Sequence, residues 1–198
     1  MAIVLRRNGK RQLHVLSSDG AGLQPIAEGI VAQGSSSWSP DGRWIVTGGS
    51  DATGPALFKI PSDGGSLVRL VSGPALNPIW SPDGSLIVYA GTNVSTFAPL
   101  LAVHPDGTNV ELTHINLRRL GEHVRFSPDG KSLIYMQGLL ASQDFWLLDL
   151  ASMKSRPLTR LQNRAAMRTF DVTSDGKQIV FDRLRENSQV VIIDLPKE

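Results

Sequence analysis

Short apolar runs separated by turn-forming residues follow one another along almost the whole chain. One set is rich in β-branched and aliphatic residues and comes after turns that contain Asp-Gly, namely "RWIVTGG", "SLIVYAG", "KSLIYMQG" and "KQIVFDR". A second set precedes another series of turns, namely "RQLHVLS", "ALFKIPS", "PLLAVHP", "FWLLDL" and "VVIIDL". Nearly continuous apolar runs of this length are typical of strands buried on both faces.

A third set of segments alternates between apolar and polar positions, which indicates strands with one exposed side. These segments are "LQPIAEG", "LVRLVSG", "VELTHI" and "SRPLTRL". Pro25 and Pro157 fall within them, and proline fits an edge strand because it has no N–H to donate to a neighbour. We therefore expect these segments to form the outermost strand of each sheet.

Two interleaved series of tight turns reveal an internal repeat. The first series is "WSPDG" at Trp38 and Trp80, "FSPDG" at Phe126 and "VTSDG" at Val172. The second contains Asp19, Asp63 and Asp106 and continues, without the glycine, around Asp149 and Asp194. The common period is about 43 residues, so each repeat holds two hairpins and four antiparallel strands, here called a to d. Such a repeat indicates the blade of a β-propeller.

The repeats predict an all-β protein, a β-propeller of four-stranded antiparallel blades, with about 4.5 to 5 blades in this chain. A length of 198 residues suits one domain, so we expect residues 1–198 to form a single, partial propeller. The expected blades are 2–29, 35–73, 77–115, 123–161 and 168–195. The first of these lacks strand a and the last lacks strand d, so both are incomplete.

The repeated Asp-Gly pairs allow a structural and a functional interpretation. They are Asp41 with Gly42, Asp83 with Gly84, Asp129 with Gly130, and Asp175 with Gly176. Such pairs tolerate the positive φ of a tight hairpin, and the carboxylate can accept N–H bonds within its own turn. The alternative is a cation site, but a hard cation prefers about six or more oxygens and each turn offers one carboxylate. We therefore favour the structural interpretation.

Basic residues gather in the connections that we expect opposite these turns. Because strand directions alternate, the a–b and c–d turns share one face, and the less regular b–c and d–a connections share the other, where binding is expected. The candidate binding residues on that face are Arg118, Arg119, His123, Arg164, Arg168 and Arg183. Two interpretations are open: a positive rim for an acidic peptide or protein partner, or scattered solvated arginines, which the small net charge favours.

Composition and charge exclude several classes of function. The net charge is only +2, so we expect neither nucleic acid nor a membrane as partner. The chain has no cysteine, which excludes disulfides and thiolate chemistry, and no run long enough for a membrane span. In "MAIVLRRNGK" the charges follow the apolar residues, the reverse of a secretion signal. Without a signal peptide in the chain, the compartment stays open between periplasm and cytoplasm.

Catalytic patterns are absent from the sequence as well. No G-x-S-x-G or phosphate-binding loop occurs, and we predict no catalytic residues and no cofactor. The four histidines are His14, His104, His114 and His123, and none shows the H-x-H or H-x-x-x-H spacing of a metal site. We therefore predict no metal site.

The repeats resemble those of TolB-like β-propellers, whose blades follow a W-S-P-D-G-K-x-I-x-F pattern with a later D-G turn and an L-T ending. The matching segments include "WSPDGSLIVYAG…LLAVHPDGTNVELT" and "FSPDGKSLIYMQG…FWLLDLASMKSRPLT", and the resemblance covers almost the whole chain. Such rings usually have six or more blades, so the resemblance implies the C-terminal part of a longer propeller. We expect either closure of an unusually small ring or association between chains that completes one.

The resemblance implies a fold more than an activity. Its leading implication is a non-catalytic, bacterial scaffold for protein or peptide interaction. Similar blades also occur in oligogalacturonate lyases, in prolyl-oligopeptidase-type peptidases and in sensor regions of bacterial kinases and regulators, so a fragment of an enzyme or a sensor domain is the alternative. Oligogalacturonate lyases hold a metal with propeller histidines, but no motif here allows those residues to be transferred.

Overall fold

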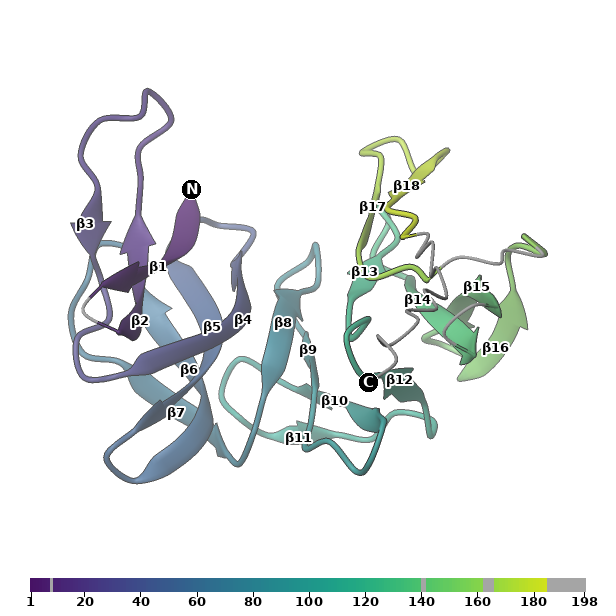
Figure 1. The fold of residues 1–198 in the computed structure, drawn as a ribbon, viewed down its shortest axis with the longest axis horizontal. Coiled ribbons are helices and arrows are strands. Elements are labelled where there is room, and N and C mark those ends of the chain that lie inside the picture. Colours follow the sequence, from purple (N-terminus) through teal and green to yellow (C-terminus); the bar gives the residue numbers. More distant parts are fainter. Residues whose placement is uncertain (8, 140–141, 162–165, 185–198) are drawn as a thin grey trace, which may run out of the picture.

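Five consecutive antiparallel β-sheets make up the described part of the chain (Figure 1). The computed structural model describes residues 1–7, 9–139, 142–161 and 166–184. In these residues all regular secondary structure is β, which confirms the expected fold class. None of the described residues belongs to a helix that could cross a membrane. The expected strand "VVIIDL" lies outside the described residues.

The second and fourth sheets have the predicted four strands, the third has five, and the first and fifth have three and two described strands. The first sheet contains β1 (Ala2–Arg7), β2 (Lys10–Val15) and β3 (Gln24–Pro25). The second contains β4 (Val31–Trp38), β5 (Trp44–Asp51), β6 (Gly54–Pro61) and β7 (Val68–Ser72). The third contains β8 (Leu76–Trp80), β9 (Ile87–Ala90), β10 (Phe97–Val103), β11 (Asn109–Val110) and β12 (Asn116–Arg118). The fourth contains β13 (Val124–Phe126), β14 (Ser132–Leu139), β15 (Ser142–Asp149) and β16 (Lys154–Pro157), and the fifth contains β17 (Phe170–Val172) and β18 (Ile179–Phe181).

Consecutive strands pair with one another, as in a meander of hairpins, except that β12 pairs with β10 and not with β11. The prolines that the sequence placed on edge strands do lie there, Pro25 in β3 and Pro157 in β16. One difference concerns residues 30–35, which we expected to be a connection: β4 begins at Val31 and continues to Trp38 through a register shift between Gln33 and Ser36. A local irregularity of this kind leaves no apolar pattern in the sequence.

The hydrophobic core is divided into clusters that lie between neighbouring sheets. Ile45 of β5 packs in the cluster between the first and second sheets, whereas the next residue, Val46, packs in the cluster between the second and third. Leu133 and Ile134 of β14 divide in the same way between the third–fourth and fourth–fifth clusters. Because successive side chains of a strand point to opposite faces, each central strand serves two cores, which explains the nearly continuous apolar runs.

Successive sheets also contact one another through the repeated turns. A Cβ placed on Gly84 would lie 3.6 Å from Pro40 Cδ, and one on Gly130 would lie 3.5 Å from Pro82 Cδ. A Cβ on Gly176 would lie only 3.2 Å from Pro128 Cδ. The proline of each turn therefore packs against the glycine of the next turn.

The five sheets do not close into a ring within the described residues. No strand of the first sheet pairs with a strand of the fourth or fifth, and the first sheet lies at the opposite end of the view in Figure 1. Strand β1 is an edge of its sheet, since β2 is its only pairing partner there. The described part is thus an open, partial arrangement of blades.

Candidate binding site

The turn carboxylates are occupied by hydrogen bonds within their own turns. The Oδ1 atom of Asp41 accepts hydrogen bonds from the Ser39 hydroxyl at 2.6 Å and from the Arg43 N–H at 3.1 Å. Asp83, Asp129 and Asp175 make the same pair of bonds with the residues two before and two after them. The following glycines, Gly42, Gly84, Gly130 and Gly176, have φ values of 72°, 74°, 72° and 70°. The carboxylates thus complete the turn geometry that a tight hairpin needs.

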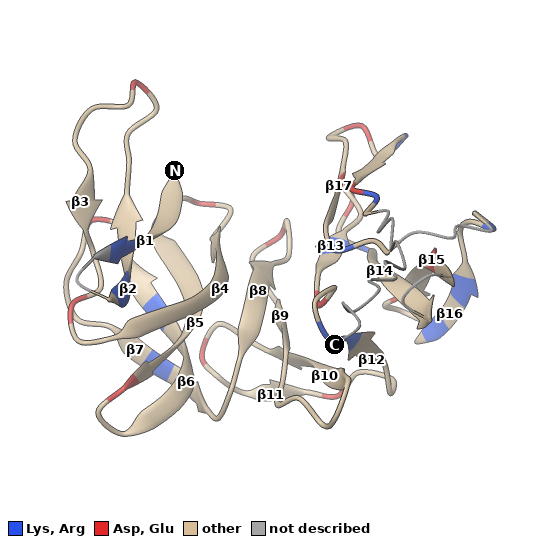
Figure 2. Ribbon diagram, viewed as in Figure 1, with Lys and Arg blue, Asp and Glu red and all other residues tan. Residues whose placement is uncertain are grey.

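These hydrogen bonds also set the charge of the turns. The Ser39 hydroxyl, the Arg43 N–H and the Arg43 side chain together lower the pKa of Asp41 to about 2. Hydrogen bonds from Ser81, Ser127 and Thr173 are the largest cause of the lowered pKa values of Asp83, Asp129 and Asp175, respectively. Figure 2 shows acidic positions in the β8–β9 and β17–β18 turns. Within the described residues, no group of three or more His, Asp or Glu side chains is placed to hold a metal ion.

The predicted basic residues fall into two groups. Arg118 is half-buried at the end of β12, with its guanidinium carbon 5.9 Å from the centroid of the Phe97 ring. Arg119 follows it and is exposed, and its N–H donates to the Thr96 carbonyl at 2.8 Å. Figure 2 shows the basic end of β12 apart from the basic positions on β16. These two arginines belong to the boundary between the third and fourth sheets.

A second group surrounds Asp182, at the boundary between the fourth and fifth sheets. Burial is the main cause that lowers the pKa of His123; Arg125 acts in the same direction, and the Asp182 carboxylate opposes both. Burial would raise the pKa of Asp182, but the N–H groups of Thr169 and Arg168 donate to its carboxylate, each at 2.8 Å, and lower it. Arg168 and Arg183 are exposed. Arg164, the remaining predicted residue, lies outside the described residues.

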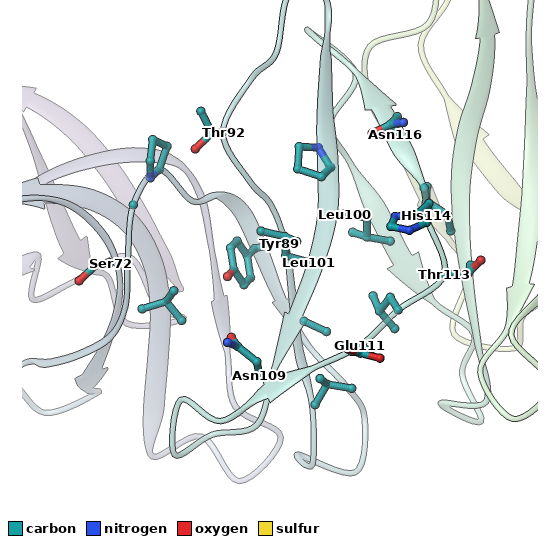
Figure 3. A pocket seen from close by; sticks show the side chains of 18 residues that line it. Ser72, Tyr89, Thr92, Leu100, Leu101, Asn109, Glu111, Thr113, His114 and Asn116 are labelled. Atoms are coloured by element: carbon teal, nitrogen blue, oxygen red, sulfur yellow. The ribbon is translucent and has the colours of Figure 1, made fainter.

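Two clefts that the sequence does not reveal lie on either side of residues 113–116. Cleft A, about 570 Å³ in volume, lies between the second and third sheets and is lined by residues such as Ser72, Tyr89, Leu101, Asn109 and His114. Figure 3 shows that its side chains come from β7, β9, β10 and the segment 109–116. Cleft B, about 650 Å³, lies between the third and fourth sheets. Thr113, His114, Ile115 and Asn116 line both clefts.

An irregular outer strand in the third sheet forms the wall between the clefts. The sequence "VELTHI" predicts one continuous strand, but β11 ends at Val110 and β12 begins only at Asn116. Both pair with β10, Val110 opposite Ala102 and Asn116 opposite Pro99, so the outer strand has three more residues than β10 over this stretch. Residues 111–114 therefore leave the regular ladder, which resumes where the Leu100 N–H donates to the Ile115 carbonyl at 2.9 Å, and the segment forms the wall that the two clefts share.

Cleft B combines a buried aromatic floor with an exposed apolar rim. Tyr135 is 2% exposed and lines the cleft together with Met136 and Trp146. At the rim, Phe97 is 39% exposed and Leu139 is 73% exposed. Arg118 lines the same cleft. Pockets for ligands are typically apolar with a few polar groups that fix orientation, which is the composition of this cleft.

A tyrosine occupies the same position in both clefts. Tyr89 and Tyr135 each lie nine residues after the aromatic residue that begins the turn motif, Trp80 or Phe126. Among the described residues, neither phenol hydroxyl has a hydrogen-bond partner, although the two side chains are only 3% and 2% exposed. Burial raises the pKa of Tyr89. Buried phenols usually hydrogen-bond, so each cleft offers an unused polar group to a ligand.

No family model and no curated protein matches the chain. Several solved structures, however, are similar to the chain. TolB from Acinetobacter baumannii is similar with a TM-score of 0.67 and 20% identity, over 91% of this chain and 46% of that one. The putative TolB from Agrobacterium tumefaciens is similar with a TM-score of 0.70 and 19% identity, over 91% of this chain and 65% of that one.

An oligogalacturonate lyase in complex with manganese is similar as well, with a TM-score of 0.64 and 17% identity, over 91% of this chain and 55% of that one. The chain thus spans between 46% and 65% of the length of these three proteins. At these identities the likeness concerns the fold and not the activity. The chain has the fold of a TolB-like β-propeller, with its blades in an open, partial arrangement.

Proposed function

We propose that this chain is a non-catalytic scaffold that binds a protein or peptide partner, and that cleft B is its binding site. The observation that supports this most is the rim of the cleft, where Phe97 and Leu139 are large apolar residues exposed beside a cavity of about 650 Å³. Exposed apolar residues that gather around a concave surface mark interaction sites more often than scattered ones do. Arg118 beside Phe97 adds a residue type that is frequent in binding hot spots.

Selection of peptides from a random phage-displayed library on the purified chain tests this function. We expect enriched peptides to bind with micromolar dissociation constants and to bind Leu139→Asp at least about tenfold more weakly, which corresponds to about 1.4 kcal/mol. Val180→Asp is the matched control, because Val180 is similarly exposed, at 64%, but lies in the fifth sheet outside cleft B. Peptides that bind Leu139→Asp and the unmodified chain equally would contradict the assignment to cleft B.

We also propose that the open edge at β1 lets chains associate. The Leu16 N–H donates to the Met1 carbonyl at 2.8 Å, and hydrogen-bonded pairs alternate along an antiparallel ladder. The N–H and C=O groups of Ala2, Val4 and Arg6 therefore point away from β2. An edge of this kind pairs readily with a strand of another chain.

A further inference from the structure

Arg118 at cleft B has no opposite charge beside it. Among the described residues it forms no ion pair, and its guanidinium instead lies over the ring of Phe97, 5.9 Å from the ring centroid. The register of β10 and β12 places these two residues directly opposite one another, so the arginine is held at the rim. A half-buried, uncompensated guanidinium is a ready partner for a carboxylate, with which it can form two parallel hydrogen bonds.

The cavity beside Arg118 suits a large apolar side chain. It is lined by Trp146 and Tyr135, which pack in the cluster between the third and fourth sheets, and Met153, 37% exposed, stands at its rim. The hydroxyl of Tyr135 has no hydrogen-bond partner in the described part of the chain and provides a polar contact within the cleft. Burial of one large apolar side chain in this cavity supplies the hydrophobic part of the binding of a short peptide.

Cleft A differs from cleft B in charge. It has a similar volume and an equivalent buried tyrosine, Tyr89, but none of the described residues that line it is an arginine or lysine. Glu111 lines it instead and would repel an anion. The charge of the two clefts therefore favours cleft B for an acidic ligand.

We propose that cleft B binds a polypeptide segment in which a large apolar side chain lies next to a carboxylate. The apolar side chain enters the cavity against Trp146, the carboxylate pairs with Arg118, and the Tyr135 hydroxyl hydrogen-bonds to the polar backbone of the segment. The carboxylate belongs either to an acidic side chain or to a chain terminus. This inference rests on the proposed function and names the ligand chemistry of the same site.

Capped peptides of defined chemistry test the proposal by NMR of a chain with ¹³C-labelled methionine methyl groups. Of the four methionines, Met153 lines cleft B with an exposed side chain, whereas Met136 and Met167 pack in the core between the fourth and fifth sheets and Met1 precedes β1, so the signals localise binding. We expect acetyl-Phe-Glu-amide to shift the Met153 signal, and acetyl-Phe-Gln-amide and acetyl-Ala-Glu-amide to bind at least about fivefold more weakly. A comparison of N-acetylphenylalanine, which has a free terminal carboxylate, with its amide tests whether the site binds a chain terminus. Tighter binding of either carboxylate ligand than of its amide supports the proposal.

The arginine variants determine whether the charge preference belongs to this site. Arg118→Gln should remove the preference for Glu over Gln, and Arg118→Glu should favour acetyl-Phe-Lys-amide instead. Arg119→Gln is the matched control, since Arg119 is exposed and does not line the cleft, and it should keep the preference for Glu. Unchanged Met1 and Met167 signals and thermal midpoints in each variant show that it is folded.

Two results would overturn the inference. One is a preference for the Glu peptide that persists in Arg118→Gln; the other is the absence of a shift at Met153 with every probe. If phage-selected peptides still require Leu139 but show no dependence on a carboxylate, the proposed function stands and the ligand chemistry inferred for Arg118 is wrong.

Discussion

The Asp41 carboxylate shows how one side chain can hold a hairpin. It accepts the Ser39 hydroxyl and the Arg43 N–H, and Ser39 in turn accepts the N–H of Trp44 at 2.9 Å. The Gly42 N–H completes the turn by donating to the Ser39 carbonyl at 2.9 Å. Such bonds favour the ionised carboxylate, so folding and the charge of Asp41 are linked.

We predict that Asp41 makes the stability of the chain depend on pH in the acid range. Its pKa is about 2 in the folded chain and 3.8 as the ordinary value. The stabilisation is therefore fully present above about pH 4 and is lost as the pH falls through about 2. Asp41→Asn should lower the urea midpoint at pH 5 and change it less at pH 2.5.

The control for this measurement is Asp63→Asn. Asp63 belongs to the second series of turns, and in the described part of the chain its side chain accepts no hydrogen bond. The urea midpoint of that variant should match the unmodified chain at both pH values. An equal effect of Asp41→Asn at pH 5 and pH 2.5 would contradict a role of the ionised carboxylate.

The a–b hairpins are held by two constraints that act on the same glycine. Gly42 and Gly176 share a left-handed φ near 70°, which strains any side chain. A Cβ built on Gly176 would also lie close to Pro128 of the preceding sheet, whereas no atom lies within 4 Å of a Cβ built on Gly42. The two positions therefore separate backbone strain from contact between sheets.

We predict that Gly176→Ala destabilises the chain more than Gly42→Ala. The left-handed backbone alone should lower the free energy of unfolding by about 1–2 kcal/mol in both variants. The contact with Pro128 should add about 1 kcal/mol for Gly176→Ala, because the ring must shift to accept the new methyl group. Urea unfolding of the two variants, and of Gly176→Ala combined with Pro128→Ala, measures the difference in the free energy of unfolding. Equal destabilisation by Gly42→Ala and Gly176→Ala would show that the proline contact does not contribute.

The strands were predictable from the sequence where local pattern and packing agree. Ile45 and Val46 are adjacent apolar residues in different cores, so a continuous apolar run correctly indicates a strand between two sheets. Leu112 and His114 look like an outer strand with alternating exposure, yet they lie in the excursion between β11 and β12. The alternation of apolar and polar residues indicates which side chains face inward. It does not indicate whether the backbone groups are placed to hydrogen-bond with β10.

The candidate site was less predictable than the fold. Arg118 was recognised as a basic residue on the less regular face, and it does line a cleft. Tyr135 and Trp146, which form the floor of that cleft, look like core residues of their strands in the sequence. A cavity arises from the wedge between two sheets, which depends on residues far apart in the chain. The interval of nine residues from Trp80 to Tyr89 and from Phe126 to Tyr135 was the one available signal.

At the scale of the whole molecule, β1 is an unpaired edge among the described strands. Ala2, Val4 and Arg6 direct their backbone groups away from β2, and the first sheet does not meet the fifth within the described residues. Unpaired strand edges of soluble proteins are usually covered or blocked by charge. Arg6, exposed at the end of β1, is the one described charged side chain of this strand.

We predict that the chain associates in a concentration-dependent manner through this edge. Light scattering should give a mass that rises above the 21.4 kDa of one chain as the concentration increases. Arg6→Pro should shift the equilibrium towards the monomer, because it removes an outward N–H without breaking a bond to β2. Leu5→Pro is the control, because it breaks the β1–β2 ladder and shows the effect of losing the strand itself. A monomeric mass of the unmodified chain at all concentrations would refute association.

The contacts between prolines and glycines of successive turns carry a consequence for how the chain unfolds. Pro40 lies against Gly84, Pro82 against Gly130 and Pro128 against Gly176, so neighbouring blades are coupled, and within the described residues no contact of this series joins the first sheet to the fifth. Stability in such an array is a sum of nearest-neighbour terms. Opening therefore begins at the terminal blades and spreads inward, and the amide protons of β9 and β10, in the middle of the series, are the last to exchange with solvent.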